Sequence, residues 1–173
     1  MKKFFSFLLT LIFLFNLSAC NNSEITPEIT PETTSATEAP VIQELDMETV
    51  YQNILTTIDA GEDIVMFSES NPDVINEFYE GISDIELKQQ LLYIHPITGF
   101  ACEIMLVEVA NEADVEKAVS IFESRIALGS DDSCYAETAA LWKSNAQVQS
   151  YGNYVCLIAL PEGYEIPANV FVN

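Results

Sequence analysis

Few side chains in this sequence are suited to chemistry. Its 173 residues include four cysteines and a single histidine, His95. One histidine excludes metal sites that need two, and any Cys–His or Ser–His pair would depend on it alone. Because His95 is followed by Pro96 and turn-forming residues, we expect an exposed imidazole or one that caps a turn.

The first cysteine follows a short apolar segment. Met1-Lys2-Lys3 is basic, residues 4–16 are mostly apolar, and Leu17-Ser18-Ala19 precedes Cys20. This order resembles the bacterial lipoprotein signal, which implies diacylglyceryl transfer to the Cys20 thiol and cleavage between Ala19 and Cys20. The apolar run is shorter than the roughly 20 residues of a membrane-spanning helix, and two acyl chains suffice for stable anchoring. The alternatives are an ordinary signal peptide or a short signal anchor.

Three other cysteines remain: Cys102, Cys134 and Cys156. An odd number leaves at least one free thiol unless chains cross-link. Cys102 and Cys156 lie in apolar strand candidates, where buried thiols are favoured over a disulfide because disulfide geometry is demanding. Cys134 lies near a predicted helix start, where the pKa of a thiol can fall, so it is the best candidate for a reactive thiol. A structural role is favoured over a reactive one, because no base lies nearby in the sequence.

Glu103 is the most unusual acidic residue, since it interrupts an apolar strand. It would lie at the end of the sheet, pair with Lys or Arg, or line a pocket. Glu103, Cys134 and His95 are therefore the candidate ligand-site residues. The sequence has no calcium-loop spacing, phosphate-binding loop or nucleophile motif, so it predicts no catalytic residue, metal site or cofactor.

The charge is strongly negative. Without Lys2 and Lys3, the chain keeps four Lys and Arg against 27 Asp and Glu, a formal net charge of −23. Nucleic-acid binding depends on basic residues that neutralise phosphates, so this class of partner is disfavoured. A polybasic contact with anionic lipid is disfavoured for the same reason.

The composition predicts three segments. Residues 1–19 form the signal peptide, and residues 20–44 form the lipidated cysteine and a tether rich in Thr, Pro and Glu. The tether contains the direct repeat Ile-Thr-Pro-Glu and little that could be buried, so we expect a spacer. Residues 45–173 form one domain, since about 129 residues suffice for one hydrophobic core but not for two domains.

The domain shows alternating helix and strand patterns. Asp46 and Asn71 can cap helices, and Gly152-Asn153 suits a hairpin turn. The apolar stripe of residues 112–128 predicts a helix with Arg125 off its buried face. Residues 133–145 predict a second helix with Tyr135 on its own buried face. Strands are predicted at 91–94, 100–109, 147–151 and 154–160. The pattern indicates an α+β fold, a small, mainly antiparallel sheet of about four strands with about four packed helices.

Two of these strands are apolar on both faces. In residues 100–109 and 154–160, both alternating sets of side chains are largely hydrophobic. Such strands are usually covered on both sides. We therefore expect either helices on both faces of the sheet or a partner that closes one face.

From about Tyr79 onward, four segments resemble a family of small lipoproteins. They are Tyr79-Glu80-Gly81-Ile82, Ala101-Cys102-Glu103-Ile104, residues 112–119 and Gly152-Asn153-Tyr154-Val155. They resemble the domain-of-unknown-function family numbered 4358, found in Gram-positive bacteria. The resemblance implies an anchored α+β domain outside the membrane, and it supplies no activity or catalytic residues.

These observations favour a non-enzymatic module anchored at the extracytoplasmic face of the cell membrane through Cys20, with an envelope protein as its partner. The alternative is a lipoprotein with a single-domain pocket near Glu103 that binds a small ligand or cation. An enzyme would have to use Cys134, His95 or Glu103, but no two groups with matched catalytic roles emerge.

Overall fold

The fold is an antiparallel sheet with helices on both faces. The computed structural model describes residues 44–62, 64–97, 100–131 and 135–172. Its five strands have the order β1-β2-β3-β5-β4, and every neighbouring pair is antiparallel. The strands are β1 (Phe67–Glu69), β2 (Leu87–Ile94), β3 (Glu103–Val109), β4 (Ala146–Tyr151) and β5 (Tyr154–Ala159). The predicted α+β class is confirmed.

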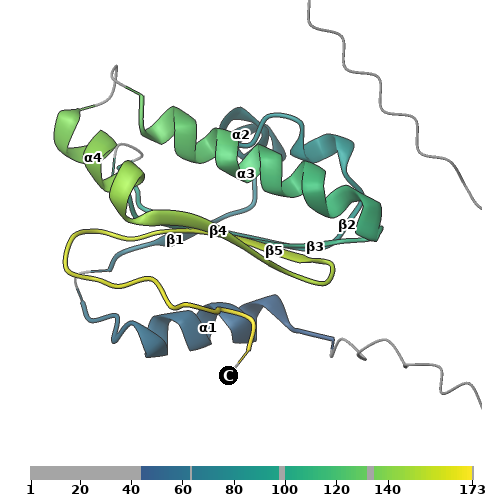
Figure 1. The fold of residues 1–173 in the computed structure, drawn as a ribbon, viewed down its shortest axis with the longest axis horizontal. Coiled ribbons are helices and arrows are strands. Elements are labelled where there is room, and N and C mark those ends of the chain that lie inside the picture. Colours follow the sequence, from purple (N-terminus) through teal and green to yellow (C-terminus); the bar gives the residue numbers. More distant parts are fainter. Residues whose placement is uncertain (1–43, 63, 98–99, 132–134, 173) are drawn as a thin grey trace, which may run out of the picture. The chain divides into compact units, whose positions relative to one another are not determined.

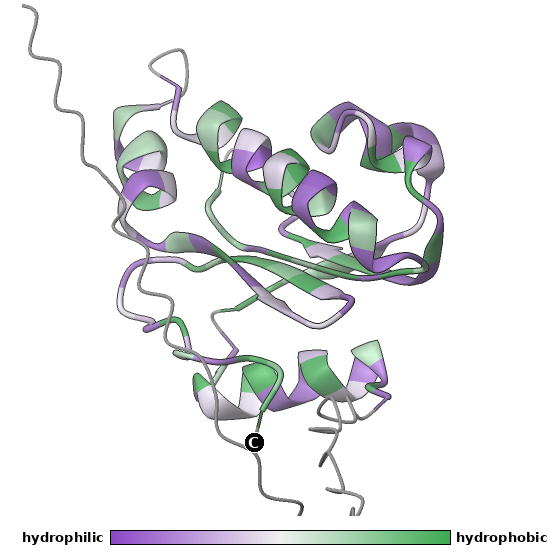
Figure 2. Cartoon of the chain, turned by 45° about the vertical axis from the view of Figure 1, so that its right-hand side comes forward, coloured by the Kyte–Doolittle hydropathy of each residue, from purple (hydrophilic) through white to green (hydrophobic). Residues whose placement is uncertain are grey.

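The helices form two layers around this sheet. They are α1 (Met47–Thr57), α2 (Pro72–Phe78), α3 (Val115–Gly129) and α4 (Ala136–Ser144), with short 3-10 turns η1 (Ile82–Asp84) and η2 (Glu112–Asp114). Figure 1 shows α2, α3 and α4 on one side of the sheet and α1 with the C-terminal segment on the other. Each helix carries both hydrophobic and hydrophilic residues (Figure 2), as expected for a helix that packs one side on a sheet.

The two faces of the central strands contribute to two separate cores. Met105 and Val107 of β3 pack in the core beneath α3, whereas Ile104 and Leu106 pack in the core above α1. The second core is completed by Phe171 of the C-terminal segment. We expected either helices on both faces of the apolar strands or a partner that closes one face. The structure shows elements of the chain itself on both faces.

Local sequence determines several element boundaries. The side chain of Asp46 caps α1 by accepting a hydrogen bond from the backbone N–H of Thr49. The side chain of Asn71 caps α2 by accepting one from the backbone N–H of Asp73. Gly152 has φ 54° in the β4–β5 turn, a conformation that glycine adopts without steric penalty. The predicted caps and this predicted turn are confirmed.

Four sequence interpretations were wrong in detail. Arg125 was placed off the buried face of its helix, yet it is 4% exposed because Glu103 lies opposite it. Tyr135 was placed in a buried stripe but is 84% exposed, since α4 begins one residue later. Phe100 lies outside β3 and is 50% exposed. The edge strand β1 was missed, because three residues are too few to show an alternating pattern.

Among the helices of the described ranges, none has the length and hydropathy needed to span a bilayer.

Candidate functional site

Glu103 forms a buried ion pair in the core beneath α3. The first residue of β3 points toward α3, where Arg125 Nη2 lies 2.6 Å from Glu103 Oε2 and Arg125 Nε lies 3.1 Å from Oε1. The hydroxyl of Tyr79 also donates to Glu103 Oε1. Glu103 is 0% exposed, so this cluster is sealed from solvent.

Two aromatic rings contact the Arg125 guanidinium. Its carbon Cζ lies 4.4 Å from the ring centroid of Trp142 on α4 and 5.0 Å from that of Phe78 on α2. Arginine stacks well on aromatic faces, because its planar group is weakly hydrated and its charge interacts with the ring electrons. The ion pair thus joins β3, α2, α3 and α4, and it stabilises one arrangement of these elements.

The electrostatics of the cluster fix the protonation states of Arg125 and Tyr79. Burial opposes the charge of Arg125, but the ion pair and hydrogen bond with Glu103 outweigh burial and raise the pKa of Arg125. Burial, followed by the negative charge of Glu103, raises the pKa of the Tyr79 hydroxyl well above its usual value. Arg125 therefore stays charged and Tyr79 stays neutral at ordinary pH. Two of the three positions predicted for Glu103 are observed together: it is the first residue of β3, at the end of the sheet, and it pairs with a basic residue.

Cys102 and Cys156 are free, buried thiols. In the β3–β5 ladder Cys156 lies opposite Leu106, and Cys102 lies four residues before Leu106. Four strand residues span roughly 13 Å, whereas the Cα atoms of a disulfide lie about 4.4–6.8 Å apart. The register therefore explains why the two cysteines do not pair.

Both thiols should resist alkylation in the native protein. Burial, followed by the charge of Glu103, raises the pKa of Cys102 to about 11, and burial raises the pKa of Cys156 further. In the full chain with Cys20→Ser and Cys134→Ser, we expect no maleimide labelling near pH 8 until denaturant is added, when both thiols react. Mass spectrometry of the intact chain measures this, and rapid native labelling of either cysteine would contradict the burial.

A raised thiol pKa has a predictable effect on stability. The folded protein binds the thiol protons more tightly than the unfolded chain does. The contribution of the two thiols to the free energy of unfolding is therefore fully present below the thiol pKa of the unfolded state, about 8.5. It should fall as the pH rises above that value toward the folded pKa of Cys102, about 11.

The other sequence candidates lie elsewhere. His95 follows β2, and its Nδ1 accepts a hydrogen bond from the backbone N–H of Ile97 at 3.0 Å, a turn-capping arrangement. Its ring centroid lies 4.8 Å from that of Phe100. Cys134 and the predicted anchor residue Cys20 fall outside the described residues. Of the two candidates among the described residues, Glu103 is buried beneath α3 and His95 caps the turn after β2, so the structure does not join them in one site.

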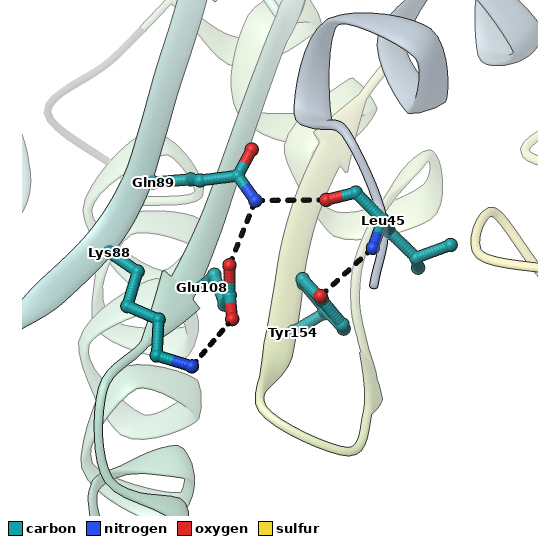
Figure 3. Close-up of polar contacts among 5 residues, drawn as sticks. All are labelled: Leu45, Lys88, Gln89, Glu108 and Tyr154. Atoms are coloured by element: carbon teal, nitrogen blue, oxygen red, sulfur yellow. Dashed lines mark hydrogen bonds and ion pairs between the residues drawn. The ribbon is translucent and has the colours of Figure 1, made fainter. Parts of the chain in front are cut away.

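A second polar cluster, which sequence reasoning missed, holds the start of the described domain to the sheet (Figure 3). Gln89 Nε2 donates to the backbone carbonyl of Leu45 at 2.9 Å and to Glu108 at 2.8 Å. The backbone N–H of Leu45 donates to the Tyr154 hydroxyl at 2.9 Å. Lys88 Nζ lies 3.0 Å from the other oxygen of Glu108. The cluster fixes where the preceding segment joins the domain, near the first residues of β2.

Tyr154→Phe should loosen this junction. The substitution removes the acceptor for the partly buried N–H of Leu45, and an unsatisfied group of this kind lowers the free energy of unfolding by about 1 kcal/mol. Urea titration measures the loss, and hydrogen exchange should report faster exchange of the Leu45 amide.

Tyr151→Phe is the matched control, because the described residues offer its hydroxyl no hydrogen bond and its ring still stacks with Phe171. Equal effects of the two substitutions would contradict a role for the Tyr154 hydroxyl.

A groove lies on the α2 side of the sheet, at the edge of β2. We call it the edge groove. It has a volume of about 390 Å³, and its lining includes apolar Ile75, Ile82, Ile85 and Leu92 with polar Glu69 and Gln90. Elements α2 and η1 form one wall, and the outer edge of β2 forms the other. Sequence reasoning missed it, because it depends on β1 ending before β2 does.

The groove is open, in contrast to the Glu103 cluster. Its volume lies within the range of about 300–1,000 Å³ typical of ligand sites. It combines apolar side chains with a free strand edge, so it can accept side chains and backbone hydrogen bonds together. Among the described residues, no three of His, Cys, Asp and Glu lie close enough together to hold a metal ion.

The comparisons with known proteins agree with the family resemblance. A family model described as Domain of unknown function (DUF4358) matches residues 59–160. The match begins after α1 and extends through β5, so it includes the sheet, the Glu103 cluster and the edge groove. No curated protein and no solved structure gives a significant match. Because the model matches more than half of the chain, this protein belongs to the DUF4358 family.

Proposed function

We propose that this protein is a lipid-anchored, extracytoplasmic interaction module of the cell envelope, without enzymatic activity of its own. The observation that carries the proposal is the edge groove, where apolar side chains and a free strand edge lie together. Strand edges of this kind commonly bind extended segments of other proteins. The order of basic flank, apolar run and Leu17-Ser18-Ala19-Cys20 supports the anchor.

The position of the junction with the tether is compatible with this role. Leu45 is held beside Gln89 and Tyr154, and Gln89 is the third residue of β2. The groove lies on the opposite face of the sheet, beneath α2. The described start of the domain therefore does not occupy the groove.

Crosslinking in intact cells tests the proposal. A photoreactive amino acid at Gln90 would lie in the edge groove, and one at Glu123 would lie on the exposed side of α3 as a matched control. We expect one dominant envelope protein to be captured from position 90 and not from position 123. Cys20→Ser should release the protein from the membrane and abolish the capture. The same background captured from both positions would overturn the proposal.

A small-ligand function is the second candidate, favoured by the groove volume of about 390 Å³. A thermal shift caused by one small molecule, and absent in controls of equal ionic strength, would support it. Glu69 lies in the groove and would contact a cationic ligand. Glu69→Gln should then reduce the shift, whereas Glu123→Gln on α3 should leave it unchanged.

A further inference from the structure

Strand β2 is only partly paired on its outer side. It has eight residues and pairs with β3 over its whole length, apart from a bulge near Lys88. On the other side, β1 covers only Leu92, Tyr93 and Ile94. The chain then turns away into α2, and the remaining residues of β2, from Leu87 to Leu91, have no described strand on their outer side.

The direction of the backbone groups identifies the free hydrogen-bonding position. In an antiparallel strand, the N–H and C=O groups of alternate residues point to opposite sides. The His95 N–H donates to the Cys102 carbonyl on the β3 side, and Ile94 and Leu92 lie beside β1. The alternation places the N–H and C=O of Gln90 on the outer side, facing the edge groove.

The groove lies where a continuation of β1 would run. Leu87, Gln90 and Leu91 line it from the strand side, and Ile75 and Ile82 line it from α2 and η1. An extended segment in this position could pair with Gln90 and place alternate side chains on the apolar wall. The five residues of β2 from Leu87 to Leu91 would span roughly 17 Å of such a segment.

The surroundings are strongly acidic. Residues 64–87 contain six Asp and Glu and no Lys or Arg. Five of these six side chains are exposed, and the sixth, Glu69, lines the groove. Lys117 reaches the outside of this region, where it donates to the Asp84 carbonyl. A basic segment would complement this charge, and an acidic one would be repelled.

We infer that the edge groove binds an extended, basic segment of a partner protein, which adds to the sheet beside Gln90 in line with β1. This inference rests on the proposed interaction function and names the chemistry of the partner. The tether is a poor occupant, because residues 21–44 contain five Glu and no Lys or Arg. A second copy of the chain would bring the same negative charge.

Peptide binding to the full-length chain in detergent tests the charge of the occupant. The probe is a peptide of about seven residues that alternates lysine and valine, long enough to follow the free edge of β2. We expect saturable binding that weakens with added salt, and affinity at least about tenfold lower for the matched glutamate–valine peptide. Equal affinity for both peptides would overturn the inference.

Backbone methylation tests strand addition without changing the protein. Alternate N–H groups of a bound strand point toward β2 and away from it. Of two peptides methylated on alternate sets of amide nitrogens, one should lose binding at least about tenfold and the other should retain it. One set of methyl groups removes the N–H groups that face β2 and also collides with the strand edge. Equal retention or equal loss in both peptides would contradict pairing along one edge.

A pair of protein variants tests the position. Gln90→Pro removes one outward N–H, at an edge where proline is tolerated, and should weaken peptide binding about fivefold. Gln90→Ala keeps the N–H and should retain binding. Unchanged binding by a folded Gln90→Pro variant would place the peptide elsewhere. If that variant does not fold, the methylated peptides still decide the matter.

Two further outcomes would replace the proposed occupant. Binding that appears only after deletion of residues 21–43 would mean that the tether covers the groove. Concentration-dependent dimers that Gln90→Pro abolishes would identify a second copy. Failure of the inference remains distinguishable from failure of the proposed function, since capture of an envelope protein from position 90 in cells does not depend on a basic extended segment.

Discussion

Arg125→Met should lower the free energy of unfolding by about 3–5 kcal/mol, because it leaves the charge of Glu103 buried without its partner. Methionine fills much of the space between Phe78 and Trp142, so the loss would report the charge rather than a cavity. Urea titration followed by circular dichroism measures the change. A loss below about 1 kcal/mol would mean that water reaches the cluster.

Replacing the whole cluster should recover most of that stability. Glu103→Leu together with Arg125→Met removes both charges, and Tyr79→Phe removes the hydroxyl that would otherwise lose its acceptor. Buried ion pairs replaced by apolar residues of similar volume are often neutral or stabilising. The triple variant should therefore be more stable than Arg125→Met alone. If the triple variant is less stable than Arg125→Met, the paired cluster stabilises the fold more than apolar residues of similar volume do.

Lys88→Met is the matched control for a surface ion pair. Lys88 pairs with Glu108 at 3.0 Å, but its side chain is 53% exposed. Water and salt screen such a pair, and Glu108 keeps its hydrogen bond from Gln89. We expect a much smaller loss than for Arg125→Met. If the two substitutions lowered the free energy of unfolding equally, burial would not explain how strongly each ion pair stabilises the protein.

The sequence predicted the unusual character of Glu103 but not its partner. A carboxylate in an apolar strand needs a compensating group when it is buried, so pairing with Lys or Arg was one expectation. Arg125 was excluded from the buried stripe, because a charged residue in a helix is usually exposed. The helix period alone could have placed it correctly, since Ala118, Phe122 and Arg125 share one face.

The two-layer arrangement was largely predictable. The alternation separated Ile104 and Leu106 from Met105 within β3, and it separated Cys156 from Leu157 within β5. The structure places these sets in two different cores, as the alternation requires. This succeeds because the strand period is short and both faces are apolar. The signal was too weak for β1, which is an edge strand of only three residues.

The edge groove and the tether junction could not be predicted from local patterns. Gln89 and Leu45 are 44 residues apart, and their hydrogen bond depends on how α1 docks on the sheet. The groove exists because β1 pairs with only part of β2. The extent of this pairing depends on the register of the two strands and on where the chain leaves the sheet. Periodicity identifies the faces of an element but not the residue at which its neighbour ends.

Gly129→Ala should lower the free energy of unfolding by about 1–3 kcal/mol, although alanine favours a helix by up to about 1 kcal/mol over glycine. Gly129 ends α3 directly against Trp142. An added Cβ would lie 2.6 Å from Cγ of the indole and still closer to Cδ2, so the two groups would overlap. The ring is fully buried, so relief of the overlap must shift either the end of α3 or Trp142, which contacts the Arg125 guanidinium.

Gly61→Ala is the matched control, because nothing lies within 4 Å of its added Cβ. Its stability should be unchanged or slightly higher, since alanine restricts the unfolded chain. Trp142→Phe provides the second test. A smaller ring leaves room for the methyl group, so the double variant should lose less stability than the sum of the two single losses. Strict additivity, or a Gly129→Ala variant as stable as the parent chain, would contradict the contact between Gly129 and Trp142 that helps to hold Arg125 over Glu103.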